Sequence, residues 1–262
     1  MYAYDVGKSL RLNKIFKDGK ALIVPIDDSF ISGPELGLRN IRNTIKTIVS
    51  SDATAMMMTY GSFVRNFDII GDFPCILNVT GSTSLSSHTN KVQIHSVEDA
   101  IKVGFVGIAV HINISSVNES SMLQIIGKIA DDCIRYSMPL MIIAYPRKEE
   151  NSGDYNYNDK SVDEYASIVR HCTRIAVELG ADLIKTHYTG TVETFKTVVD
   201  SAEGVPVLIS GQSLKDERSV LQRTCDVMEA GASGVCFGRN IYNREDSRSF
   251  VSALSKIIWC SK

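Results

Sequence analysis

The stretch FVGIAVHINISSVNESSMLQIIGKIADDCIRYSMPLMIIAYP, residues 105–146, indicates one strand–helix–strand unit. Its two ends, FVGIAVHI (105–112) and PLMIIAYP (139–146), are short apolar runs of strand length. The segment between them, residues 120–137, repeats apolar side chains with the period of an amphipathic helix. Runs that are apolar on both faces are typical of strands that are covered on both sides. The stretch therefore predicts two buried strands joined by a helix.

The same alternation continues in both directions along the chain. Six further strand candidates are ALIVPID (21–27), ATAMMMT (53–59), FPCILNVT (73–80), ADLIKTHY (181–188), VPVLISG (205–211) and GVCFGR (234–239). Eight strands alternating with helices over about 250 residues is the count of a (β/α)₈ TIM barrel. A doubly wound open sheet is the alternative. It would normally use fewer strands and a G-x-G-x-x-G after the first strand, which is absent here.

Composition favours one soluble domain over residues 1–262, with a short N-terminal extension (1–20) and a polar loop (147–161). Apolar residues make up 44% of the chain and the formal net charge is −2. Basic residues are spread out, which argues against nucleic acid or an anionic membrane as a partner. No run approaches the roughly 18 apolar residues of a membrane helix. The scattered cysteines show no metal-ligand spacing, so we expect free thiols, no metal site and a cytoplasmic location.

In a TIM barrel the active site lies at the carboxyl ends of the strands. Lys185 stands near the end of the strand predicted at 181–188. Burial there would lower the pKa of its amine, and a neutral amine can attack a carbonyl to form a Schiff base. The alternative is a lysine that reaches solvent or pairs with an acid. Tyr145 ends the neighbouring strand and can move a proton, although a packed core tyrosine is the simpler interpretation.

Other polar side chains also follow predicted strands. Asp27 can orient a substrate hydroxyl or act as a base, but it can equally cap a loop. Asp28 would point away from the barrel axis if the strand continued through it. His111 and His187 can be acids, bases or substrate ligands, or hydrogen-bonded residues of the barrel interior. We expect the substrate to be bound near Asp28 and His187.

Two glycine-containing turns follow the last two predicted strands, where many TIM barrels bind phosphate. They are Ser210-Gly211 and Gly238-Arg239. Backbone N–H groups of such turns can face an anion, and the guanidinium group of Arg239 can add a bidentate, charged hydrogen bond. These four residues are the candidates for a phosphate site.

Several of these motifs together resemble one family over almost the whole chain. The resemblance rests on VPIDDSFISGPELGL, LNVTGSTSL, MIIAYPRK, ELGADLIKTHYTG, VPVLISG and EAGASGVCFGRNIY. It is the archaeal-type class I aldolase family. This family includes class I fructose-bisphosphate aldolases, 2-amino-3,7-dideoxy-D-threo-hept-6-ulosonate synthases and the autoinducer-2 phosphate thiolase.

The resemblance implies a role for each candidate residue. In the family, the lysine at the position of Lys185 forms the Schiff base, and the tyrosine at the position of Tyr145 donates and accepts protons. Asp27 is implied as the catalytic or orienting acid, and the two glycine turns as the site of the substrate phosphate. It further implies a TIM barrel, no cofactor, a donor of dihydroxyacetone-phosphate type, an aldehyde acceptor and a homo-oligomer.

Two positions depart from the family pattern. The usual Asp-His-Gly is Asp27-Asp28-Ser29 here, and the usual Gly-Gly-Pro-Lys begins Gly211-Gln212. These changes put the choice of substrate and the phosphate contact in question. They favour a heptulosonate-synthase-like biosynthetic enzyme over a class I fructose-bisphosphate aldolase. Acyl transfer with coenzyme A and a phosphosugar-binding barrel without turnover remain open. A zinc-dependent aldolase is disfavoured because no histidine cluster stands at the strand ends.

Overall fold

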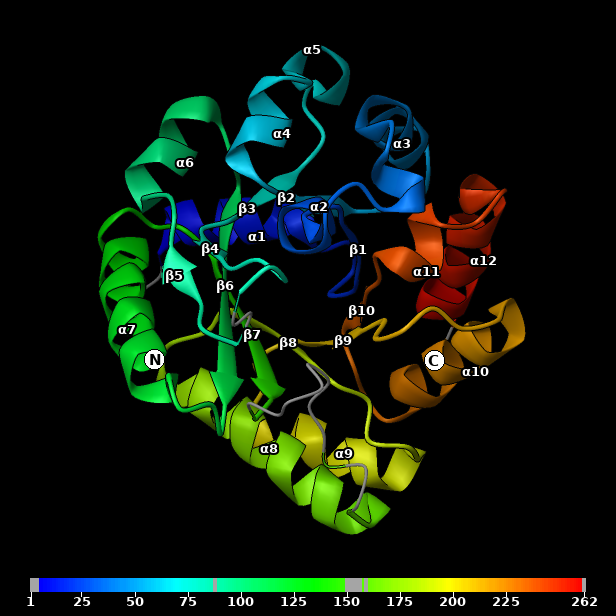
Figure 1. The fold of residues 1–262 in the computed structure, drawn as a ribbon. Coiled ribbons are helices and arrows are strands. Elements are labelled where there is room, and N and C mark those ends of the chain that lie inside the picture. Colours follow the sequence, from blue (N-terminus) through cyan, green and yellow to red (C-terminus); the bar gives the residue numbers. More distant parts are fainter. Residues whose placement is uncertain (1–4, 87–88, 149–156, 158–159, 261–262) are drawn as a thin grey trace.

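The strands form a closed barrel, as the computed structural model of the chain shows for residues 5–86, 89–148, 157 and 160–260. Eight parallel strands follow one another around the barrel in the order β1-β10-β9-β8-β7-β6-β3-β2. Helices surround the strands on the outside (Figure 1). The predicted TIM barrel is therefore confirmed.

Each barrel strand lies within or beside one of the predicted apolar runs. Their bounds are β1 Ala21–Pro25, β2 Ala55–Met58, β3 Cys75–Asn78, β6 Gly107–Ile114, β7 Leu140–Pro146, β8 Leu183–Thr186, β9 Val207–Ser210 and β10 Gly234–Cys236. Most strands are shorter than the apolar run that predicted them. Several apolar residues of these runs that lie just beyond the strands, among them Ile26, Val79 and Phe237, are buried in the main hydrophobic core.

The longer helices around the barrel are amphipathic and bury an apolar face against the core. The helices are α1 Val6–Ile15, α2 Asp28–Ser32, α3 Ile41–Val49, α4 Tyr60–Val64, α5 Phe67–Ile70, α6 Val97–Val103, α7 Glu119–Arg135, α8 Val162–Glu178, α9 Val192–Ser201, α10 Glu217–Glu229, α11 Arg239–Tyr242 and α12 Ser247–Cys260, with a 3₁₀ turn at Leu36–Leu38. The predicted N-cap of α8 is correct, because Ser161 and Glu164 form a reciprocal capping box. Among the described helices, none combines the length and apolar character needed to span a membrane.

Strand alternation decides which side chains enter the barrel. On β8, Ile184 packs outward against the helices, whereas Leu183 belongs to the cluster inside the barrel. Lys185, two residues after Leu183, therefore points inward as well. Ile143 and Tyr145 of β7 are inward-facing for the same reason, and Ile143 is the neighbour of Lys185 in the strand register. The alternation places an amine and a phenol above an apolar interior.

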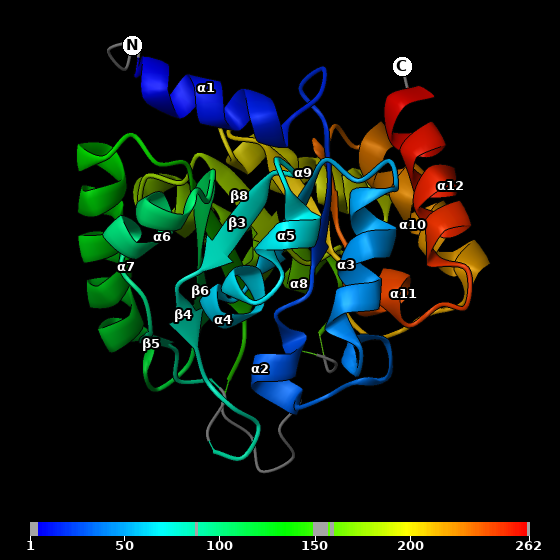
Figure 2. The same cartoon turned by 90° about the horizontal axis from the view of Figure 1, so that it is seen from above.

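Helix α1 closes the amino-terminal end of the barrel. Ile15 is fully buried in the interior cluster, with Leu12 and Phe16 packed beside it. An ion pair of 2.9 Å between Lys8 and Asp182 holds the helix against the loop before β8. Figure 2 shows α1 across one end of the barrel and α2 at the other. The predicted N-terminal extension thus contains a helix that belongs to the barrel.

A short antiparallel hairpin, β4 (Thr80–Gly81) and β5 (Val92–Gln93), follows β3. It lies at the same end of the molecule as α2 (Figure 2). The ring of Phe30 of α2 packs closely on Gly81, because a Cβ at this position would lie 2.6 Å from it and the ring would have to move. Of the polar loop predicted at 147–161, residues 149–156 and 158–159 lie outside the described part of the chain.

Candidate active site

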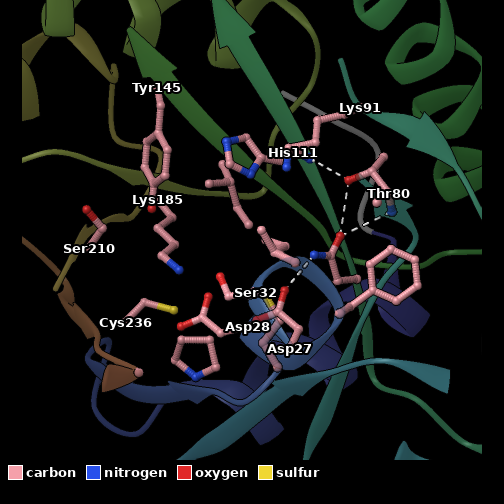
Figure 3. Close-up of a pocket in the computed structure, with 18 of the residues that line it drawn as sticks. Asp27, Asp28, Ser32, Thr80, Lys91, His111, Tyr145, Lys185, Ser210 and Cys236 are labelled. Atoms are coloured by element: carbon pink, nitrogen blue, oxygen red, sulfur yellow. Dashed lines mark hydrogen bonds between the residues drawn. The ribbon is translucent and has the colours of Figure 1, made fainter. Parts of the chain in front are cut away.

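A cavity of about 260 Å³ opens at the carboxyl ends of the strands. It brings together all the candidate residues of the sequence, which are Asp27, Asp28, His111, Tyr145, Lys185, His187, Ser210, Gly211, Gly238 and Arg239. Figure 3 shows the side chains that converge on it. The size suits a small metabolite, and the lining is rich in groups that titrate or form hydrogen bonds.

Lys185 is buried, with 7% of its surface exposed. Its amine points toward the Cys236 thiol and the carboxylates of Asp27 and Asp28 (Figure 3). Burial alone would lower the pKa of Lys185, but Cys236, Tyr145 and the two carboxylates oppose burial and hold the pKa above its ordinary value. The expected lowering of this pKa is therefore wrong. The resting amine is an ammonium, and it must lose a proton before it can attack a carbonyl.

Asp27 lines the same cavity as Lys185, and the charge of each shifts the pKa of the other. It does not end β1 itself but follows Ile26 and caps the short helix α2. Its carboxylate accepts a hydrogen bond of 2.6 Å from Nδ2 of Asn78. Burial, and then the negative charge of Asp28, raise the pKa of Asp27, while Lys185 and Asn78 act in the opposite direction. A buried carboxylate with a raised pKa, beside a buried ammonium, is suited to proton transfer.

Asp28 does not point away from the barrel axis, contrary to the expectation from strand alternation. The strand ends at Pro25 and a helix begins at Asp28, so the alternation of β1 does not extend to this residue. Its side chain lines the cavity. One oxygen accepts a hydrogen bond of 2.5 Å from the hydroxyl of Tyr242 and lies 3.7 Å from Nε of Arg239. Asp28 thus orients the arginine of the predicted phosphate site.

Tyr145 lies between two histidine rings. The ring of His111 meets it edge-on at a centroid distance of 4.9 Å, and the ring of His187 lies against it at 4.1 Å. His187 is partly buried, and burial together with the charges of Arg147, Lys185 and Arg223 lowers its pKa to about 3. His187 is therefore a neutral group near neutral pH, and both histidines restrict the position of the phenol.

The predicted phosphate end of the cavity is built from backbone turns. Both glycines are necessary there, because a Cβ on Gly211 would lie 2.9 Å from Nδ2 of Asn240 and one on Gly238 would lie 2.9 Å from the Pro25 carbonyl. Asn240 donates hydrogen bonds to the carbonyls of Gly211 (2.8 Å) and Ser213 (3.1 Å), which ties the two turns together. Within the described residues, the buried Oγ of Ser210 has no hydrogen-bond partner, so it is available to a ligand.

Gln212 replaces a glycine of the family pattern but keeps a glycine-like backbone. Its φ is +54°, in the left-handed region. Its side-chain oxygen accepts a hydrogen bond of 3.2 Å from Arg223 of α10. The bulkier residue is thus accommodated by a strained backbone and a side chain held by Arg223.

Four residues with a clear place at this site were not singled out from the sequence: Lys91, Cys236, Tyr165 and Arg223. Cys236 could have been identified, because it is the last residue of β10 and lies two residues before Gly238. Lys91 carried no signal in the sequence, because it follows a polar loop and precedes a strand of two residues.

In the described ranges, no group of three or more His, Cys, Asp or Glu side chains is arranged to hold a metal ion. The chemistry available to these residues is nucleophilic attack by an amine together with proton transfer.

Comparison with known proteins supports this chemistry. The family model of the DeoC/LacD family aldolases matches residues 21–244. The chain is 34% identical to 2-amino-3,7-dideoxy-D-threo-hept-6-ulosonate synthase of Halobacterium salinarum, over 97% of this chain and 92% of that protein. It is 36% identical to class 1 fructose-bisphosphate aldolase of Thermoproteus tenax, over 93% and 91%. An archaeal fructose-1,6-bisphosphate aldolase, solved with its catalytic lysine bound to the carbinolamine intermediate, superimposes with a TM-score of 0.85 at 28% identity, covering 96% of this chain and 99% of that one.

Proposed function

This chain belongs to the DeoC/LacD family of aldolases, and from that premise we propose that it is a metal-independent, Schiff-base-forming aldolase or transaldolase that acts on a phosphorylated ketose. The observation that carries the proposal is the position of Lys185. It is a buried amine on β8 that points into the cavity beside Asp27 and near Tyr145.

Proton transfer comes first, because the resting amine is charged. Asp27 accepts the proton of Lys185 as the donor enters, and the neutral amine attacks the ketone carbon to give a carbinolamine. Loss of water gives an iminium. The substrate phosphate is bound by Ser210, the turn at Gly211 and Arg239, which fixes the ketone over the amine.

The iminium then accepts the electron pair of the carbon–carbon bond that breaks. Tyr145 first gives its proton to the hydroxyl that leaves the carbinolamine as water, and the resulting phenolate takes the proton from the hydroxyl group of the departing aldehyde, so that an enamine remains on Lys185. In the synthetic direction the enamine attacks an aldehyde acceptor and Tyr145 returns the proton. Hydrolysis of the new iminium frees Lys185, so electrons and protons balance without a cofactor.

A biosynthetic role of the heptulosonate-synthase kind is the finer proposal. It is supported by the altered turns, where Asp28 pairs with Arg239 and Gln212 occupies a glycine position. A class I fructose-bisphosphate aldolase is the alternative, supported by the Thermoproteus tenax relative. Cleavage of fructose 1,6-bisphosphate without an added acceptor favours the alternative. Transfer of the donor only to an added aldehyde favours the biosynthetic role.

Borohydride trapping tests the proposal directly. The folded protein is incubated with dihydroxyacetone phosphate or fructose 1,6-bisphosphate, reduced with sodium borohydride, and analysed by intact-mass spectrometry and peptide mapping. We expect an adduct on Lys185 that is absent in Lys185→Met. A folded protein that binds these ketose phosphates but gives no adduct would contradict the proposal and favour a phosphosugar-binding barrel without turnover.

A further inference from the structure

Asp27 is held by a chain of hydrogen bonds that begins on another strand. Its carboxylate accepts a bond of 2.6 Å from Nδ2 of Asn78, the last residue of β3. Oδ1 of the same amide accepts two bonds of 3.1 Å from Thr80, one from its backbone N–H and one from its hydroxyl. The Thr80 hydroxyl in turn accepts a bond of 2.9 Å from the backbone N–H of His111 of β6. Backbone groups of β4 and β6 thus hold the amide that faces Asp27 (Figure 3).

Thr80 fixes which way the amide of Asn78 points. The two ends of an amide are similar in shape, but the oxygen accepts hydrogen bonds and the nitrogen donates them. A backbone N–H can only donate, so the N–H of Thr80 requires the oxygen of Asn78 on its side. Because His111 donates to the Thr80 hydroxyl, the hydroxyl proton is directed to the same oxygen. The nitrogen of Asn78 must then face Asp27, and the carboxylate always meets a donor there.

This donor matters because burial disfavours a charged Asp27. Asp27, Asn78 and Thr80 are 6%, 7% and 4% exposed, so the bonds between them are shielded from water. Burial and the charge of Asp28 raise the pKa of Asp27, whereas Lys185 and the bond from Asn78 lower it. Lys185 ceases to be a cation when it gives up its proton. The amide of Asn78 does not titrate, so it donates to Asp27 at every stage.

We propose that Asn78 and Thr80 are positioning residues that hold Asp27 ready to accept the proton of Lys185. Asn78 donates to the carboxylate, and Thr80 keeps the amide in the one orientation that allows this bond. The inference rests on the proposed function, because this is the proton that Lys185 loses before it attacks the ketone. The proton moves from the ammonium nitrogen of Lys185 to a carboxylate oxygen of Asp27, and it returns when the amine is set free.

Asp27 titrates beside several other groups in the cavity. The titratable side chains that line the cavity with it, one from each surrounding element, are Asp28 of α2, Lys91 of the segment before β5, His111 of β6, Tyr145 of β7, Lys185 of β8 and Cys236 of β10. The variants Asn78→Leu and Thr80→Val alter none of these side chains and introduce no charge. A changed titration of Asp27 in these variants therefore reports on the chain of hydrogen bonds.

Carbon-13 NMR of the side-chain carboxyl groups measures the titration of Asp27 in the resting protein, with its signal assigned by its absence in Asp27→Asn. Asn78→Leu is close in size and removes the donor, so we expect it to raise the pKa of Asp27 by at least about one pH unit. Thr80→Val removes only the hydroxyl and should raise this pKa by less. Thr80→Ser retains the hydroxyl and should keep the wild-type pKa. An unchanged titration in a folded Asn78→Leu protein overturns the inference.

Thr54 supplies the matched control. Its hydroxyl also accepts a bond from a strand backbone, at 3.1 Å from the nitrogen of Leu22, but at the amino-terminal end of the barrel. Thr54→Val should leave the pKa of Asp27 unchanged. If Asn78→Leu does not fold, the two variants of Thr80 decide, because equal titrations in Thr80→Val and Thr80→Ser overturn the inference.

The pH profile of kcat/KM separates positioning from general damage to the site. A higher pKa leaves Asp27 charged in a smaller fraction of molecules at low pH, so the acidic limb of the profile should move to higher pH in Asn78→Leu. We expect a loss of about tenfold on that limb for each pH unit of the NMR shift, and recovery of most of the activity at the pH optimum. An equal loss at every pH overturns the inference.

Borohydride trapping of the wild-type protein reports separately on the proposed function. Absence of an adduct on Lys185, together with the expected shift of Asp27 in Asn78→Leu, would refute the proposed function and leave the hydrogen-bond chain established. An adduct on Lys185 without any shift of Asp27 would overturn only the role of Asn78 and Thr80.

Discussion

The hydroxyl of Tyr165 lies 2.8 Å from Nδ1 of His187. Tyr165 belongs to α8, and its hydroxyl has no other hydrogen-bond partner among the described residues, so the hydroxyl donates its proton to Nδ1. Burial raises the pKa of Tyr165, which keeps that proton on the hydroxyl. The proton of the neutral His187 ring is then on Nε2, the ring nitrogen that can still bond to a ligand in the cavity. A residue outside the cavity thus sets which atom of His187 can donate to a substrate oxygen.

Replacement of Tyr165 by phenylalanine tests this relationship. Loss of one hydrogen bond, worth about 0.5–1.5 kcal/mol, should lower kcat two- to tenfold with little change in the donor KM. The ¹⁵N chemical shifts of His187 should change from those of a single tautomer to those of a mixture of both tautomers. The control is Tyr157→Phe, which removes the hydroxyl of a neighbouring tyrosine that donates to Ser115 and not to His187. This variant should leave kcat and the ¹⁵N shifts of His187 unchanged. An unaltered ¹⁵N signature in Tyr165→Phe would show that the tautomer is fixed by other contacts.

The low pKa of His187 also predicts that the stability of the folded protein depends on pH. The pKa of this residue is about 3 in the folded protein against 6.5 for the free side chain. Between these two values the unfolded chain binds a proton at this residue and the folded protein does not. The free energy of unfolding therefore falls as the pH decreases through this window, by up to about 1.4 kcal/mol per pH unit.

The variant His187→Gln should flatten this dependence, as measured by urea denaturation at pH 7, 6, 5 and 4. His171→Gln, at an exposed position of α8, is the matched control and should retain the wild-type slope. A wild-type slope in both variants would mean that other groups account for the loss of stability in acid.

Asp28 should set the pH range of activity. Its negative charge raises the pKa of Asp27 and contributes to the raised pKa of Lys185. In Asp28→Asn both pKa values should fall, so the profile of kcat/KM against pH should shift to lower pH. Tyr242→Phe keeps the charge and removes only the hydrogen bond to Asp28, and its profile should shift less. A profile that does not move in Asp28→Asn would contradict proton transfer between Asp27 and Lys185.

Gln212 allows a test of backbone strain in the phosphate turn. A non-glycine residue in the left-handed region costs about 1 kcal/mol relative to glycine. Gln212→Ala retains this strain and loses the bond from Arg223, whereas Gln212→Gly loses the bond and relieves the strain. We expect the glycine variant to be about 1 kcal/mol more stable than the alanine variant in urea denaturation. Equal stabilities would show that the turn relaxes when the side chain is removed.

The sequence predicts the barrel well because buried parallel strands are continuous apolar runs. Lys185 and Tyr145 were identified for a related reason: each is a polar residue near the end of such a run, and the cavity contains both. Helix α1 was missed because only Ile15 of its ten residues is fully buried, which leaves almost no apolar period.

The errors at the site have a physical cause in each case. The direction of Asp28 depends on where β1 stops, and an apolar run does not define that residue. The charge of Lys185 depends on neighbours from other strands, among them Cys236 and Asp27, whose proximity is set only when the barrel closes. The position of Lys91 in the cavity depends on the register of the hairpin β4–β5, which consists of two residue pairs.

The closure of the barrel by α1 has a consequence for the order of events in catalysis. With Ile15 filling the amino-terminal end, both substrates must approach Lys185 from the opposite end and leave by the same route. The donor must react with Lys185 before the acceptor can, so an acceptor that arrives first occupies the route the donor needs. We therefore expect compulsory-order kinetics, with the ketose first and the product aldol last. An excess of acceptor should inhibit the reaction competitively against the donor.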